Sequence, residues 1–247
     1  MCQPTIEMWN HSVFLMLNAG PQAPAIAIAI ARFLAGWTPY LAMVLVLFAW
    51  VRRSTILRFA LLDATFAALI GLGMAQMISA VWYHPRPLEI GLGRQLLDHA
   101  AEASFPSDHA TLLFALAMPL LRTAASRRWG FALLSLGIGA AWSRVYLGVH
   151  FPLDMLGAFG VASLAALMIA RSAPLLHRKL YPRLVLIYEA VLCRLGRRQD
   201  LVKTGQVSVR PSLKGPPKGS YGTPRSPANR AMHRLNSSSR RADQPPP

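Results

Sequence analysis

Three short clusters of Arg, Ser, His and Asp lie within or beside long apolar segments. They read HPRP at His84–Pro87, FPSDH at Phe105–His109 and SRVYLGVHFPLD at Ser143–Asp154. Polar and ionisable groups are costly inside a bilayer, so their presence there usually marks a functional site. We predict that the three clusters meet in space and bind a phosphate group, which one of the histidines then attacks.

The third cluster contains a spaced histidine–aspartate pair. Pro152 is predicted to begin a helix, and Asp154 falls in its first turn, four residues beyond His150. The carboxylate can then accept a hydrogen bond from one imidazole nitrogen, which leaves the other nitrogen unprotonated, as a nucleophile requires. The alternative interpretation is a pair that only caps the start of a helix.

The second cluster opens an apolar helix. Pro106 suits the first helical turn, and Ser107 together with the free N–H groups there would form an anion site. His109 would face whatever binds. Simple capping by Ser107 and Asp108 is the alternative, and it leaves a histidine at the bilayer unexplained.

The first cluster holds an arginine between two prolines. Pro85 and Pro87 restrict the backbone, which would aim the guanidinium of Arg86. Arginine binds phosphate oxygens two at a time. The alternative is a positive residue at a membrane edge.

The elements that position these clusters are predicted to be membrane helices. The chain has 247 residues, 53% of them hydrophobic, and a formal net charge of +16. The apolar runs argue against a nucleic-acid partner for the body of the chain, and the two cysteines give no metal-ligand spacing. A span needs about 20 residues, so the third run is short. We predict an all-α, polytopic membrane helix bundle with five clear spans: Phe33–Val51, Phe59–Val81, His109–Leu121, Trp129–Tyr146 and Leu153–Ala170.

The N-terminal segment allows two interpretations. Residues 5–19 are mildly amphipathic, and the pattern breaks at Asn18–Pro21. The segment would be either an interfacial helix or the start of a sixth, bent span, which Arg32 disfavours. No cleavable signal peptide is evident at this end.

The basic loops predict the orientation. Three groups of arginine and lysine fall on one side of the alternating spans, which the positive-inside rule assigns to the cytoplasm. The three clusters then share the opposite face. The basic groups are Arg52, Arg53 and Arg58; Arg122, Arg127 and Arg128; and Arg171, Arg178, Lys179 and Arg183.

The order RP, PSDH and SRVYLGVHFPLD resembles the type 2 phosphatidic acid phosphatase superfamily, whose signature is a Lys-containing RP motif, PSGH and SR-x5-H-x3-D. Within this superfamily, the HPRP and ASFPSDHAT motifs and the IYEA segment at Ile187–Ala190 are similar to those of bacterial undecaprenyl-diphosphate phosphatases linked to bacitracin resistance. The resemblance covers about residues 5–195.

The resemblance implies a two-step phosphatase without a metal or other cofactor. His150 would attack the terminal phosphorus and form a phosphohistidine, and Asp154 would orient it. His109 would protonate the leaving group and then activate water. The phosphoryl oxygens would be held by Arg86, Ser107 and Arg144.

The resemblance also implies a substrate and a location. The substrate would be a polyprenyl diphosphate lipid, undecaprenyl diphosphate, cut to undecaprenyl phosphate and phosphate on the periplasmic face of the inner membrane.

We divide the chain into a membrane phosphatase domain (1–175), an amphipathic helix on the cytoplasmic membrane surface (176–199) and a disordered basic tail (200–247).

Two positions depart from the superfamily pattern. Ser79 stands where the signature has Lys, so the pocket loses a cation that His84 would partly replace. Asp108 replaces the Gly of PSGH and would repel a diphosphate unless it points away, binds another group or tunes His109. We include His84 and Asp108 in the predicted phosphate site.

Three other functions stay open. One is phosphatidic acid or phosphatidylglycerophosphate phosphatase activity, and another is a lipid phosphotransferase. The third is a metal-binding transporter, although transporters carry such residues near the midplane rather than at one face. Its ligands would be His84, His99, His109, His150 and Asp154. His99 and Glu102 either line the site entrance or are solvated loop residues.

Overall fold

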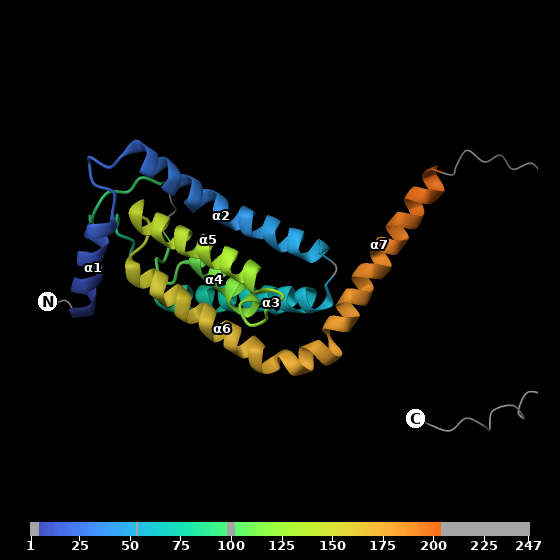
Figure 1. Cartoon of the computed structure of the whole chain (residues 1–247). Helices are drawn as coiled ribbons and strands as arrows, with labels where there is room; N and C mark the ends of the chain where they lie inside the picture. Colours follow the sequence, from blue (N-terminus) through green and yellow to red (C-terminus); the bar gives the residue numbers. More distant parts are fainter. Residues whose placement is uncertain (1–4, 53, 98–101, 204–247) are drawn as a thin grey trace, which may run out of the picture. The chain divides into compact units, whose positions relative to one another are not determined.

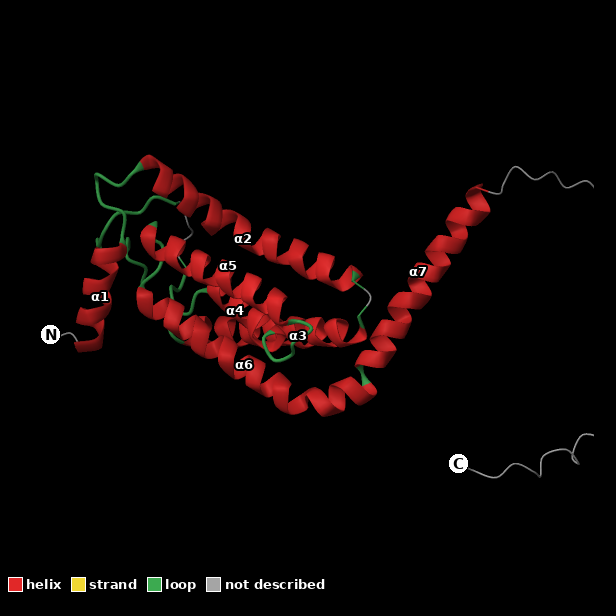
Figure 2. Ribbon diagram, in the orientation of Figure 1, coloured by secondary structure: helices red, strands yellow, loops and turns green. Residues whose placement is uncertain are grey.

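The secondary structure is entirely helical in the part of the chain that the computed structural model describes, residues 5–52, 54–97 and 102–203 (Figure 2). The all-α prediction is therefore confirmed. His99 and the predicted tail beyond Lys203 lie outside the described residues. The helices are α1 (Thr5–Leu17), α2 (Ala25–Val51), α3 (Thr55–Val81), α4 (Asp108–Leu120), α5 (Arg127–Tyr146), α6 (Pro152–Lys179) and α7 (Tyr181–Lys203).

The short helix α4 lies at the centre of the bundle, against α3, α5 and α6, while α2 packs mainly along α5 (Figure 1). Many of the core positions are alanine, such as Ala64 on α3, Ala115 on α4 and Ala162 on α6. Small residues let helix backbones approach closely in a membrane, where packing rather than the hydrophobic effect holds helices together.

Among the described residues, three helices, α2, α3 and α6, are long and apolar enough to cross a membrane. The other two predicted spans are not confirmed: α4 has 13 residues, about 20 Å of helix, and α5 carries Arg127, Arg128 and Arg144. The predicted start of the first span at Phe33 is wrong. Helix α2 begins at Ala25, after Pro24. Arg32 does not interrupt it, because its side chain extends from the helix and donates to the Leu96 carbonyl at 3.1 and 3.2 Å.

The break at Asn18–Pro21 is present and separates α1 from α2. The Asn18 amide donates to the carbonyl oxygens of Arg94 and Tyr146 at 2.9 and 3.1 Å. Buried Asn10 accepts the N–H of Leu153 at 3.0 Å. These bonds fix α1 beside the start of α6, where the third sequence cluster lies. The chain turns there at Gly148, where φ is +77° and a Cβ would lie 2.2 Å from the Arg94 carbonyl oxygen.

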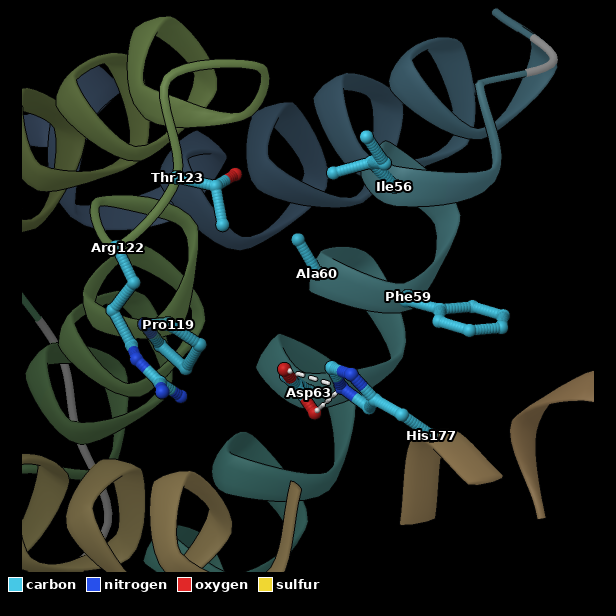
Figure 3. A pocket seen from close by; sticks show the side chains of 8 residues that line it. All are labelled: Ile56, Phe59, Ala60, Asp63, Pro119, Arg122, Thr123 and His177. Carbon is cyan, nitrogen blue, oxygen red and sulfur yellow. Dashed lines mark hydrogen bonds and ion pairs between the residues drawn. The ribbon is translucent and has the colours of Figure 1, made fainter. Parts of the chain in front are cut away.

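A buried carboxylate joins the helices at the other end of the bundle. Asp63 on α3 accepts hydrogen bonds from the His177 imidazole at 3.0 and 3.1 Å and from the Tyr181 hydroxyl at 2.9 Å. Figure 3 shows the His177 ring beside Asp63. Both residues line a cavity of about 310 Å³, which Arg122 also lines. The network ties α3 to the junction of α6 and α7.

Replacing Asp63 with alanine should lower the stability of the bundle by about 1–3 kcal/mol, because the fully buried Tyr181 hydroxyl then loses its acceptor. The measurement is the apparent melting temperature of the purified protein in detergent. Glu189→Ala is the matched control, since this half-exposed carboxylate pairs with Arg58 and should matter less. A larger drop for Glu189→Ala would contradict the assignment.

Candidate active site

One cavity of about 470 Å³ takes residues from all three sequence clusters. Arg86 comes from the loop after α3, Asp108 and His109 from the start of α4, and His150 from the loop before α6. These segments are up to 64 residues apart in the chain. The packing of α4 against both α3 and α6 therefore brings the two histidines and an arginine to the same space.

The His150 ring is held by one nitrogen and turned toward Arg86 by the other. Its Nδ1 lies 2.9 Å from the Ser104 carbonyl oxygen and 3.3 Å from Asp154 Oδ2, and its Nε2 lies 3.4 Å from Arg86 Nη1. A carbonyl only accepts, so the Nδ1 bond requires the proton there and leaves the lone pair on Nε2. Burial lowers the pKa of His150, with Asp154 partly offsetting this, which favours the neutral ring.

Asp154 combines the two interpretations that its sequence position allowed. The carboxylate is fully buried, and its Oδ2 accepts the Phe151 N–H at 2.8 Å, which caps α6. The same oxygen accepts the Ser104 hydroxyl and faces His150 Nδ1. Helix capping and histidine orientation therefore use one oxygen, and the cap fixes the carboxylate that orients the ring.

Arg86 is buried and held by main-chain oxygens. Its Nε donates to the Glu102 carbonyl at 2.9 Å and its Nη1 to the Val149 carbonyl at 3.2 Å. Neutral acceptors fix the guanidinium without cancelling its charge. Arg86 therefore brings a positive charge to the cavity beside His150 Nε2, a cavity that Glu102 and Asp108 also line.

Ser107, Arg144 and His84 do not line this cavity. Ser107 is fully buried at the start of α4, and its hydroxyl has no hydrogen-bond partner among the described residues. Nε and Nη1 of Arg144 on α5 also have no hydrogen-bond partner among the described residues, and the residue is only 3% exposed. Its guanidinium interacts electrostatically with Arg86 and Asp108. His84 lies behind the site, against Asp154 and Glu7.

At each of the two positions that depart from the superfamily pattern, the side chain forms a hydrogen bond within the protein. Asp108 Oδ2 accepts the Gln76 amide at 2.8 Å, so the carboxylate binds another group of the protein. Ser79 donates to the Phe105 carbonyl at 3.1 Å and holds the loop before α4. Glu102 lines the cavity, as one of its two interpretations required.

Ser104 is the residue that sequence reasoning missed. Its hydroxyl bonds Asp154, its carbonyl faces His150 Nδ1, and its N–H donates to the His84 carbonyl at 2.8 Å. The only signal was its place directly before the FPSDH motif. Gln76 was visible as a polar interruption of a predicted span, but nothing local indicated its partner.

A second cavity, of about 360 Å³, shares Asp108 and His109 with the first. Its remaining wall is mostly apolar and comes from α2, α3 and α4, namely Gly36, Pro39, Tyr40, Leu72 and Leu112. A charged cavity thus adjoins an apolar one, an arrangement that suits a ligand with a polar head and an apolar tail.

Comparison with known proteins supplies the family. A profile described as the PAP2 superfamily matches residues 83–178. "Putative undecaprenyl-diphosphatase YbjG" of Escherichia coli (strain K12) is 38% identical over 184 residues, which are 72% of this chain and 90% of that protein. "Undecaprenyl-diphosphatase BcrC" of Bacillus subtilis (strain 168) is 29% identical over 189 residues, 76% of this chain and 96% of its own length.

A solved structure shares the fold. The crystal structure of Aquifex aeolicus LpxE superposes with a TM-score of 0.55 at 19% identity and covers 66% of this chain and 95% of that one. The profile match, the relatives and the three ordered motifs agree, and the resemblance seen in the sequence is confirmed. The chain belongs to the PAP2 superfamily.

Proposed function

We propose that this protein is a membrane-embedded undecaprenyl-diphosphate phosphatase, which releases undecaprenyl phosphate and inorganic phosphate. The observation that carries the proposal is the position of His150 Nε2, 3.4 Å from Nη1 of the buried Arg86, in a cavity that His109 also lines. The names of the two relatives and the adjoining apolar cavity support the choice of a polyprenyl diphosphate.

In the first step, His150 Nε2 attacks the terminal phosphorus and forms a nitrogen–phosphorus bond. The bond from that phosphorus to the bridging oxygen breaks, and undecaprenyl phosphate leaves with a proton from His109. In the second step, His109 takes a proton from water, and the water oxygen attacks the phosphohistidine. The nitrogen–phosphorus bond then breaks, which releases phosphate and restores neutral His150.

The cations would stabilise the phosphoryl group during both steps. Arg86 lines the cavity, and Arg144 and Ser107 are buried nearby with polar atoms that lack partners in the described chain. A buried guanidinium without a counter-ion is costly, and an incoming phosphate would offset that cost. Three phosphoryl oxygens that gain charge in the transition state provide the matching acceptors.

The membrane arrangement is part of the proposal. Helices α4 and α5 would complete five spans, with α4 shielded from lipid by its neighbours, and the domain would comprise residues 1–175. The basic loops favour the cytoplasm for the end that holds Arg122, and so a periplasmic site in the inner membrane. Helix α7 exposes Leu186, Ile187 and Arg183, as expected for a helix on the membrane surface.

The test is phosphate release from undecaprenyl diphosphate by the full-length protein in detergent, with and without EDTA. We expect equal rates in both, without any added lipid acceptor, because the two histidines do the work of a metal. Release only from phosphatidic acid or phosphatidylglycerophosphate would contradict the substrate. A requirement for an acceptor lipid or a divalent ion would contradict the mechanism.

A further inference from the structure

His84 lies between two carboxylates and is not among the residues that line the cavity. Its Nδ1 is 3.9 Å from Asp154 Oδ1, and its Nε2 is 3.7 Å from Glu7 Oε1 on α1. The rings of Trp82 and Phe151 pack on the imidazole at centroid distances of 6.0 and 5.7 Å. The side chain is largely buried, so these neighbours rather than solvent form its environment.

The two carboxylate oxygens of Asp154 differ in their hydrogen bonds. Oδ2 accepts from the Phe151 N–H and the Ser104 hydroxyl and faces His150 Nδ1. Oδ1 is buried and has no hydrogen bond to any described residue, and the same is true of His84 Nδ1. An unsatisfied buried acceptor costs about 1–3 kcal/mol, so a donor for Oδ1 is expected. His84 Nδ1 needs to move only about 1 Å to supply it.

We propose that His84 is a positioning residue for the proposed hydrolysis. Its Nδ1 donates to Asp154 Oδ1, while its Nε2 faces the Glu7 carboxylate of α1. The inference rests on the proposed function of His150 and extends it to two residues that touch no substrate. The line of groups runs from Glu7 through His84 and Asp154 to His150. Helix α1 then contributes to the active site through Glu7.

The proposed hydrogen bond would change how strongly Asp154 stabilises the protonated form of His150. The carboxylate stabilises the imidazolium form of His150, which cannot attack phosphorus. A donor on Oδ1 draws charge away from Oδ2 and weakens that pull. Without it, His150 should hold its proton to higher pH. The charged and titratable groups that face His84 are Glu7 and Asp154, with His11 beyond Glu7 at 3.8 Å and Arg86 two residues along the same loop.

The test compares three variants of the full-length protein in detergent. His84→Phe keeps a ring between Trp82 and Phe151 but removes both nitrogens, and His84→Gln restores an N–H donor. His11→Phe is the matched control, because His11 also packs on Phe151 and approaches Glu7. The measurements are kcat, KM and the pH dependence of phosphate release from undecaprenyl diphosphate.

We expect His84→Phe to lower kcat about tenfold with little change in KM, and to move the acid limb of kcat/KM up by about half a pH unit. His84→Gln should recover most of both effects, and His11→Phe should show neither. A loss of kcat without a shifted limb, or an equal shift in His11→Phe, would reduce His84 to packing and overturn the inference.

A second readout separates this inference from the proposed function. Diethyl pyrocarbonate acylates neutral imidazoles, and peptide mass spectrometry reports the modification of His150 at each pH without turnover. The pH midpoint of this modification should rise in His84→Phe by the same shift of about half a pH unit. An inactive wild type with this shift contradicts the substrate alone, whereas an active wild type without it contradicts the positioning role.

Discussion

Replacing His150 with alanine should abolish phosphate release, with a loss of at least about 10³-fold. The variant lacks the nitrogen that forms the covalent bond, and Arg86 cannot supply one. Wild-type protein stopped in alkali during turnover should carry phosphate on His150, because phosphohistidine is stable to base, and the variant should carry none. Mass spectrometry of the peptide that contains residue 150 measures both.

The control for this variant is His11→Ala, which removes a histidine that contacts Glu7 and Phe151 outside the cavity. Both variants should insert into membranes and purify in equal amounts. Near-normal turnover by His150→Ala, or phosphate found on another histidine, would show that the nucleophile is assigned to the wrong residue.

The wild-type pH profile has an expected sign. In the proposed mechanism the neutral form of His150 is the active one, so activity should fall as the pH drops through the pKa of this group. Burial lowers that pKa, and the acid limb of kcat/KM should therefore lie below the ordinary imidazole value of about 6.5. An acid limb well above this value would mean that Asp154, rather than burial, dominates.

Replacing His109 with alanine should lower kcat by about 10²–10⁴-fold, the usual contribution of a general acid and base. His109 lines the same cavity as His150, from the first turn of α4. The proposed mechanism requires its side chain to reach both the leaving oxygen and the attacking water. The measurement is the rate of phosphate release from undecaprenyl diphosphate by wild type and variant.

Leaving-group dependence distinguishes acid catalysis from a loss of shape. An aryl phosphate such as p-nitrophenyl phosphate leaves without a proton, so the formation of its phosphoenzyme should be nearly as fast in His109→Ala as in wild type. The later attack by water should stay slow, and phosphohistidine should accumulate. Equal losses for both substrates in the first step would contradict the role of His109 as the acid.

The order of helices was accessible from the sequence because it depends on local rules. Apolar runs broken by Asn18–Pro21 and by the basic loops placed the helices, and the FPSDH motif placed the start of α4. The predicted start of α2 was wrong because a charged side chain extends out of that helix to a distant acceptor. Arg32 was held to disfavour a span through this segment, but its long side chain reaches the Leu96 carbonyl and leaves the backbone helical.

The sequence by itself determined the family, the nucleophile candidate and its aspartate, since His150 lies just before α6 and Asp154 lies in the first turn of α6, so their contact is local. The tertiary structure alone decided which distant groups join them. His84, predicted for the phosphate pocket, lies behind Asp154, and Asp108 bonds Gln76. These contacts join residues 32 and 70 positions apart, so they depend on how α1, α3, α4 and α6 pack, which local spacing does not encode.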